Sequence, residues 1–277
     1  MFAIILSRRV LRRLEKSKYV DNLVLKGGLL IYSLTEFDSR VTVDVDFLLK
    51  QISNTPEQLR QVITEIISVE TGNDFITFEV TDVAPIALAK KYAGVGVSLQ
   101  AIIKNTRTHF SIDFGVGDII VPKQEKRCIP TQLEDFSSPI INTYSIETTI
   151  AEKIDAILLL MEFSSRMKDY YDIYYLSHKF DFSGNVLCEA LSKTFANRGH
   201  NFTIEQFQQV MAFDADDGMR KKWKAFKKKI DVKMGEFPEI LQSINSFLGE
   251  PYPAVMKEEK FEKQWMAYDG SWSAINE

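Results

Sequence analysis

The chain of 277 residues has 45% hydrophobic and 26% charged residues, a balance typical of globular proteins and not of disordered, collagen-like or coiled-coil chains. Its net charge of −4 argues against a protein that binds polyanions over its whole surface. Cys128 and Cys188 lie far apart, which excludes a disulfide framework and a thiolate zinc site, and three isolated histidines argue against a histidine-rich metal site.

The lengths of the apolar runs and the order of residues in the first segment indicate the cellular location of the protein. No run approaches the roughly 18 residues that are needed to cross a bilayer. The apolar segment 1–6 precedes its arginines, whereas in a signal peptide the basic residues come first. We therefore expect a cytoplasmic protein without a membrane partner.

Hydrophobic spacing in the first half alternates between the periods of helices and strands. In chain order it predicts a helix over 8–17, a strand over 23–25, a helix over 29–34, a strand over 40–50, a helix over 56–70, a strand over 75–81, and a hairpin over 95–103 and 109–114. This order predicts an α/β domain with a mixed sheet.

Beyond a polar connector at 130–144 the apolar spacing is helical throughout. It predicts helices over 145–161, 168–177, 186–196, 203–213, 218–232 and 237–247. We therefore expect two domains, an α/β domain over 1–138 and an all-helical domain over 139–277.

Asp44 and Asp46 lie on the strand predicted over 40–50. Residues two apart in a strand share a face, with Cα atoms about 6.6 Å apart. Two carboxylates so placed can hold a pair of divalent cations, the arrangement used in phosphoryl transfer. Thr42 would share this face and add a hydroxyl. Two solvated aspartates on the open face of a strand are the alternative interpretation.

The segment Lys26-Gly27-Gly28 ends one predicted strand and precedes a helix. Glycines at a helix start let a phosphate approach the backbone N–H groups, although many glycine pairs are only tight turns. Asp113 ends a later apolar strand and would complete a three-carboxylate metal site with Asp44 and Asp46. A surface turn residue is the alternative for Asp113.

Lys153 lies on a largely apolar helix stripe, where it must either extend to solvent or meet an anionic partner. A nucleotide phosphate is one such partner, and the side chain of Glu152 or Asp155 is another. Asp169 and Asp172 share one face of the next predicted helix. Ion pairs of these aspartates with Arg166 and Lys168 are the simplest account of that spacing.

A basic segment stands out within the acidic second half of the chain. Trp223, Phe226 and Ile230 recur at helical spacing, which predicts an amphipathic helix with a cationic face. Binding of RNA phosphates and a merely solvated face account for this pattern equally well. The candidate RNA-binding residues are Arg220, Lys221, Lys222, Lys224 and Lys228.

Three blocks in this order, at 23–28, at 40–47, and at 151–154 with 166–173, resemble the AbiEii/AbiGii family of nucleotidyltransferase toxins. The resemblance covers roughly residues 9–180. It implies a DNA polymerase β-like nucleotidyltransferase fold with a helical C-terminal part. It also implies the toxin component of a bacterial toxin–antitoxin or abortive-infection system, with a cognate antitoxin as partner. Some members move a nucleotide from NTP to tRNA acceptor ends.

The resemblance implies a role for each candidate residue. Two Mg²⁺ ions would be held by Asp44, Asp46 and Asp113, and Asp113 would also help to activate the attacking hydroxyl. NTP would be bound by Lys26, Gly27, Gly28, Thr42 and Lys153. Asp169 and Asp172 would face the nucleotide cleft, and one of them would position Lys153 or the incoming base. The chain departs from many nucleotidyltransferases in having Leu29 after the second glycine, where a serine or threonine is common.

Two other functions stay open at this point. The first is nucleotide transfer to a small molecule, such as an antibiotic hydroxyl, in place of an RNA acceptor. The second is a catalytically silent module that binds nucleotide or RNA. The acidic positions together with Lys153 argue against the silent module, because a binding protein does not need them.

Overall fold

A computed structural model describes residues 2–42, 44–72, 75–86, 94–131, 136–230 and 234–274. The chain divides into two compact units. The first, called here the sheet unit, comprises Met1–Asp118 and Gln124–Tyr144. The second, the helical unit, comprises Ile119–Lys123 and Ser145–Glu277. No helix in the described part of the chain has both the length and the apolar composition that a bilayer span requires.

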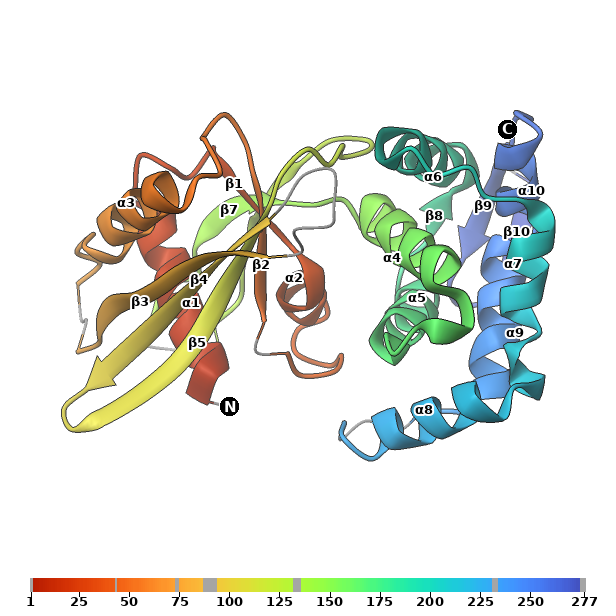
Figure 1. Cartoon of the computed structure of the whole chain (residues 1–277). Helices are drawn as coiled ribbons and strands as arrows, with labels where there is room; N and C mark the ends of the chain where they lie inside the picture. The colour runs from red at the N-terminus through yellow and green to blue at the C-terminus, as the bar shows by residue number, and fades with distance from the viewer. Residues whose placement is uncertain are drawn as a thin grey trace. The chain divides into compact units, whose positions relative to one another are not determined.

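The sheet unit is built on a mixed sheet of seven strands, which confirms the predicted α/β class (Figure 1). The strand order is β3-β4-β5-β2-β1-β7-β6. The β2–β5 and β1–β7 pairs are parallel and the other pairs are antiparallel. The strands are β1 (Leu23–Lys26), β2 (Val45–Leu49), β3 (Thr77–Ile86), β4 (Gly94–Ile103), β5 (Thr106–Gly115), β6 (Glu125–Cys128) and β7 (Ile140–Thr143).

Three helices pack on this sheet, namely α1 (Phe2–Glu15), α2 (Gly27–Leu34) and α3 (Pro56–Ile67). Helix α2 packs on β1 and β2, whereas α1 and α3 contact each other as well as the sheet. As the sequence predicts, α3 starts at a proline, and the Thr55 side chain accepts a hydrogen bond from the Gln58 N–H. Its apolar face is buried, so packing rather than propensity stabilises it.

Two predicted segments of the sheet unit differ from the structure. The strand predicted over 40–50 begins only at Val45, where pairing with Ile112 of β5 starts; Val43 lies outside the described residues. The polar connector predicted over 130–144 contains β7, which pairs in parallel with β1. A four-residue strand has too few residues to show a period, and only its tertiary partner stabilises it. The sheet unit consequently extends to Tyr144, beyond the boundary predicted at 138.

The helical unit contains seven α-helices and two short 3-10 helices within its described residues. The α-helices are α4 (Ile146–Leu160), α5 (Met167–Lys179), α6 (Gly184–Arg198), α7 (Ile204–Met211), α8 (Asp217–Lys227), α9 (Phe237–Leu248) and α10 (Pro251–Met256). The 3-10 helices are η1 (Met161–Phe163) and η2 (Phe213–Ala215). Helix α8 ends at Lys227, earlier than the predicted 232, and residues 231–233 lie outside the described part.

The prediction that this half is all-helical is wrong for its C-terminal tail. Strands β9 (Lys263–Met266) and β10 (Ser271–Ala274) form a hairpin that adds to β8 (Phe182–Ser183). Aromatic packing stabilises it, since the ring of Trp272 stacks on that of Phe247 at 5.9 Å and the indole N–H of Trp265 donates to the Ser177 carbonyl at 2.6 Å.

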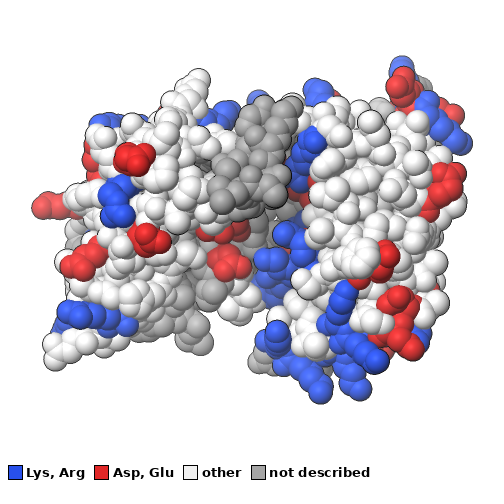
Figure 2. Space-filling model, in the orientation of Figure 1, with Lys and Arg blue, Asp and Glu red and all other residues white. Residues whose placement is uncertain are grey.

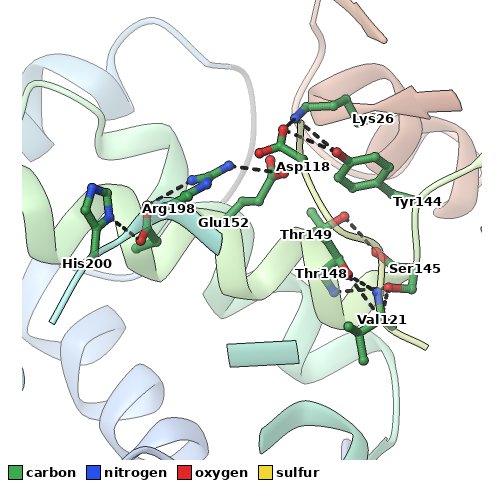
Figure 3. A network of polar contacts seen from close by, with 11 residues as sticks. Lys26, Asp118, Val121, Tyr144, Ser145, Thr148, Thr149, Glu152, Arg198 and His200 are labelled. Atoms are coloured by element: carbon green, nitrogen blue, oxygen red, sulfur yellow. Dashed lines mark hydrogen bonds and ion pairs between the residues drawn. The ribbon is translucent and has the colours of Figure 1, made fainter. Parts of the chain in front are cut away.

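Hydrogen bonds at the start of α4 explain why Ile119–Lys123 belongs to the helical unit (Figure 3). The Val121 N–H donates to Oγ1 of Thr148 at 2.8 Å. The hydroxyls of Ser145 and Thr148 both donate to the Val121 carbonyl. Ser145 also caps α4, because its Oγ accepts from the Thr148 N–H at 3.1 Å. This short segment is therefore attached to α4 by side chains that also begin the helix.

Candidate functional site

The glycine turn between β1 and α2 holds the side chain of Asp46 against the start of the helix. Gly27 has φ of +70°, in the left-handed region that favours glycine. A Cβ atom added at Gly27 would lie 2.9 Å from Cγ and 3.1 Å from Cβ of Asp46. Both the backbone angle and the space therefore require glycine here, and the Asp46 carboxylate lies beside the first N–H groups of α2.

The second glycine makes room for the predicted hydroxyl of Thr42. A Cβ atom added at Gly28 would lie 2.9 Å from Oγ1 and 3.0 Å from Cβ of Thr42. Thr42 is buried although it precedes β2. The structure thus brings Gly27, Gly28, Thr42 and Asp46 together around one helix start, as the sequence analysis expected for a phosphate site.

Asp113 lies beside Asp46 on the neighbouring strand. The two residues are Cα partners in the parallel β2–β5 pair, where adjacent strands are about 4.8 Å apart. Lys26 is the partner of Asp46 on the other side, in the antiparallel β1–β2 pair. Asp113 is therefore a residue of a central strand, and the alternative that it belongs to a surface turn is excluded.

Asp44 is placed differently from the other two carboxylates. It is exposed in the segment before β2, so the alternation that would put it on the face of Asp46 does not apply. Among the described residues no three His, Cys, Asp or Glu side chains come together in a group that could hold a metal ion. The predicted three-carboxylate cluster is therefore not assembled, and a role of Asp44 remains a prediction.

The two carboxylates on neighbouring strands, those of Asp46 and Asp113, have the chemistry to bind a magnesium ion. Asp46 and Asp113 offer carboxylate oxygens, which Mg²⁺ prefers, and Mg²⁺ commonly takes one or two carboxylates together with water and phosphate oxygens. Both side chains are half-buried at neighbouring positions of one sheet. These two residues would hold the ion, beside the helix start that suits a phosphate.

Lys26 belongs to a polar cluster that sequence reasoning missed. Its Nζ lies 2.7 Å from Oδ2 of Asp118 and 3.3 Å from the hydroxyl of Tyr144, and the three side chains point toward one another (Figure 3). The glycine-rich turn after β5 was visible in the sequence, but nothing linked Asp118 to Lys26 across 92 positions. Asp118 and Tyr144 thus orient the ammonium of Lys26, whose backbone is the cross-strand partner of Asp46.

In the helical unit, Lys153 is paired with both aspartates that the sequence analysis selected. Its Nζ lies 3.0 Å from Oδ1 of Asp169 and 2.6 Å from Oδ2 of Asp172. Both carboxylates are fully buried, and Lys153 itself is nearly so. The alternative in which Lys153 extends to solvent is therefore wrong.

Arg166 completes this cluster from the start of α5. Its Nε lies 2.5 Å from Oδ2 of Asp169, the ion pair that the sequence spacing predicts. Burial alone would raise the pKa of Asp169, but the positive charges of Lys153 and Arg166 outweigh that effect and hold the pKa below its usual value. Two cations thus balance two buried carboxylates.

A second charged cluster connects α4 with the end of α6. Arg198 lies 3.1 Å from Glu152 and 2.9 Å from Asp155, and Nδ1 of His200 lies 2.7 Å from the other oxygen of Asp155 (Figure 3). The sequence analysis considered Glu152 and Asp155 as partners of Lys153. In the structure, Glu152 and Asp155 pair with Arg198, and Lys153 pairs with Asp169 and Asp172.

Helix α8 carries the predicted basic face. Trp223 and Met219 are buried, whereas Arg220, Lys221, Lys224 and Lys228 are exposed, and basic side chains gather over this helix in Figure 2. Some of the charge is neutralised locally, because Arg220 pairs with Asp217 and Lys227 pairs with Glu236. Lys222 donates to the carbonyl of Glu162 at 2.7 Å.

The predicted site residues thus form groups within each unit. The sheet unit gathers Gly27, Gly28, Thr42, Asp46 and Asp113, with Lys26 beside them. The helical unit gathers Lys153, Asp169 and Asp172. A strand that ends in a glycine turn before a helix, with paired carboxylates on the adjoining strands, is an arrangement that can bind a nucleoside triphosphate through metal and backbone.

The chain is similar to a known protein family and to solved structures. The family model described as "Nucleotidyl transferase AbiEii toxin, Type IV TA system" matches residues 9–243. The crystal structure of a Helicobacter pylori protein assigned as a nucleotidyltransferase is 14% identical, with 92% of this chain and 96% of that chain covered and a TM-score of 0.48. The Helicobacter pylori protein JHP933 is 15% identical, with 91% and 90% covered and a TM-score of 0.49. Among curated proteins, none matches the chain significantly. Since the family model covers most of its length, the chain belongs to the AbiEii family of nucleotidyltransferase toxins of type IV toxin–antitoxin systems.

Proposed function

We propose that this nucleotidyltransferase moves a nucleotide from NTP to an RNA acceptor, the tRNA 3′ end, with Mg²⁺ as its metal. The observation that carries the proposal is the position of Asp46, which lies against Gly27 at the start of α2 and in register with Asp113. This arrangement unites a phosphate-binding helix start with metal-binding carboxylates.

The triphosphate would bind at the start of α2. Backbone N–H groups and the positive end of the helix dipole attract phosphate oxygens there, and glycine leaves room for close approach. The missing hydroxyl at Leu29 is compensated by Thr42, whose Oγ1 lies over Gly28. Lys26, held by Asp118 and Tyr144, adds positive charge at the same end of β1.

Nucleotide transfer follows from these positions. The acceptor hydroxyl attacks the α-phosphorus, a new P–O bond forms, the bond to the β-phosphate oxygen breaks, and pyrophosphate leaves. Asp113 accepts the proton of the attacking hydroxyl. Asp46 and Asp113 would hold magnesium, which when bound would neutralise charge on the triphosphate.

The cluster in the helical unit would hold one more cation for the phosphates. Two buried carboxylates fix the ammonium of Lys153 from two sides, which reduces its conformational freedom. Asp169 and Asp172 would therefore act as positioning residues for Lys153. Family membership also implies a cognate antitoxin as a partner of the protein.

The proposal is tested by incubating the full chain with Mg²⁺, each radiolabelled NTP in turn, and total RNA. We expect one labelled RNA size class with wild type and at least a hundredfold loss for Asp46→Asn and for Asp113→Asn. Asp82→Asn is the matched control, because Asp82 is an exposed aspartate on β3. Absence of labelled RNA with every NTP, in a protein with a native circular dichroism spectrum, would contradict the proposal.

The same assay separates the other two functions. Transfer to a small molecule gives a labelled product of low mass and no labelled RNA. A silent binding module gives no product and keeps its cellular phenotype in Asp46→Asn. The exposed lysines of α8 favour an RNA acceptor over a small one, because a small acceptor does not need a cationic surface.

A further inference from the structure

Phe163 is an exposed aromatic side chain in the helical unit. It is the last residue of η1 and is 84% exposed. Leu159 and Leu160, at the end of α4, are exposed as well. A group of large apolar side chains in water marks a surface that another molecule covers.

The backbone before Phe163 turns sharply. Met161, which ends α4, has φ of 47° and ψ of −136°, a combination that residues with a side chain rarely adopt. Such a conformation persists only when the surrounding structure enforces it, and it often occurs at functional positions. The η1 turn therefore presents Phe163 from a defined position rather than from a loose loop.

Helix α8 lies next to this turn. The ammonium of Lys222 donates to the carbonyl of Glu162 at 2.7 Å, which joins α8 to the residue before Phe163. Lys221, Lys224 and Lys228 follow at i, i+3 and i+7, so they form one exposed stripe about 10 Å long. In the described part of the chain these three lysines have no ion-pair partner.

We propose that η1 and α8 form a binding surface for single-stranded RNA, with a base stacked on Phe163 and the phosphates along Lys221, Lys224 and Lys228. An exposed aromatic ring beside a cationic stripe is the combination by which proteins bind single strands. A protein partner would bury the exposed apolar side chains of η1 and α4. Only an acidic partner would also account for the stripe of exposed lysines on α8. The inference rests on the proposed RNA acceptor. It goes further by naming a surface, outside the reacting centre, that binds this RNA.

The stacking contact is tested by fluorescence anisotropy with a fluorescein-labelled single-stranded RNA of 12 nucleotides and no NTP. We expect Phe163→Ala and Phe163→Leu to weaken binding about tenfold or more, and Phe163→Tyr to stay within twofold of wild type. Tyr268→Ala is the matched control, because Tyr268 is 98% exposed in the β9–β10 turn of the same unit.

The lysine stripe is tested through the salt dependence of the same binding. Each phosphate contact of a single strand contributes about 0.7 to the slope of log K against log salt. We therefore expect Lys221→Gln with Lys224→Gln to reduce the slope by about 1.4. Lys257→Gln with Lys260→Gln is the control, because both lysines are exposed away from α8 in sequence.

The proposal is overturned if Phe163→Ala or the lysine double variant binds RNA like wild type, or if Phe163→Leu retains full affinity, since leucine cannot stack. It is also overturned if Phe163→Ala changes only self-association in sedimentation velocity or only antitoxin binding, which would make the surface a protein interface. Because no NTP is present, the outcome is independent of catalysis. If wild type labels RNA but the substitutions at Phe163 leave RNA affinity unchanged, the proposed RNA surface is refuted and the proposed transfer is not. If the protein binds RNA at this surface but labels none, the proposed transfer is refuted.

Discussion

At the scale of single residues, Gly27 is a position where both the backbone angle and the available space favour glycine. Its φ is positive, and a side chain would enter the space of Asp46. Gly28 is restricted by space alone, because a Cβ atom there would lie 2.9 Å from Oγ1 of Thr42. The two glycines therefore do more than form a turn, because their lack of side chains lets an acidic strand residue and a hydroxyl approach the start of α2.

We expect Gly27→Ala to lower both stability and transfer activity. The backbone angle alone costs about 1 kcal/mol for a residue with a Cβ atom, and displacement of Asp46 adds to it. Gly72→Ala separates the two effects, because Gly72 has φ of +68° with no atom within 4 Å of the added Cβ. Urea unfolding and the RNA-labelling assay are the measurements.

We expect Gly72→Ala to lose about 1 kcal/mol and to keep its activity. Gly27→Ala should lose more stability than this and most of its activity. Equal behaviour of the two variants would mean that Asp46 does not depend on the glycine for its position.

Residues whose partners are close in sequence were predictable, and those with distant partners were not. The Arg166–Asp169 pair follows from helix spacing, and so does the face shared by Asp169 and Asp172. The choice of Lys153 as their partner needed the packing of α4 on α5. Asp118 and Tyr144 approach Lys26 only through the folded sheet unit, so no local pattern could select them.

At the scale of elements, the α4–α5 pair is connected by charge as well as by apolar packing. Lys153 on α4 lies between Asp169 and Asp172 on α5, and all three are buried. A buried ion pair adds little stability over an apolar pair, but removal of one partner leaves an uncompensated charge. The cluster thus contributes more to the specific arrangement in which α4 packs on α5 than to the free energy of that packing.

Lys153→Met tests this description. We expect it to lower the free energy of unfolding by about 3–5 kcal/mol, because two buried carboxylates lose their shared cation. Lys193→Met is the control, since the Lys193–Glu189 pair lies on the surface of α6 and contributes less than about 1 kcal/mol. Chemical denaturation of both variants at neutral pH is sufficient. A loss below 1 kcal/mol for Lys153→Met would show that the cluster is hydrated.

The same cluster makes stability depend on acidity. The pKa of Asp169 is lower in the folded protein than its ordinary value of 3.8, so the folded state binds the proton more weakly than the unfolded state. The stabilisation is complete above pH 3.8 and is lost as the pH falls below that value toward the folded pKa.

Unfolding measured between pH 6 and 2 should therefore show a steeper acid loss for wild type than for Asp169→Asn, which cannot titrate. Asp181→Asn serves as the surface comparison, because Asp181 is exposed beside β8. Parallel acid profiles for wild type and Asp169→Asn would rule out this contribution of Asp169.

Long, strongly periodic elements were predicted well, and most of the short strands were not. The β4–β5 hairpin and helices α3, α4 and α9 occur close to their predicted ranges. Strands β6 to β10 have two to four residues each, too few for a period to appear. The strand predicted over 40–50 starts earlier than β2, because the alternation of apolar and polar residues begins before Val45, where pairing with β5 starts.

At the scale of the whole molecule, the predicted catalytic residues are divided between two compact units. The carboxylates and the glycine turn belong to the sheet unit, and the buried lysine cluster and the basic helix belong to the helical unit. The net charge of −4 hides this division, since a local cationic surface on α8 coexists with an acidic remainder. Composition alone therefore gave no indication of where an anionic substrate would bind.

In the proposed function, the helix start at Gly27 and Gly28, with Asp46 and Asp113, receives the triphosphate and its metal. A crystal structure of the full chain with Mg²⁺ and a non-hydrolysable NTP analogue tests it most directly. We expect phosphate oxygens on the backbone N–H groups at the start of α2 and a magnesium ion on the carboxylates of Asp46 and Asp113. An analogue bound elsewhere, or a metal without ligands from these two aspartates, would contradict the account.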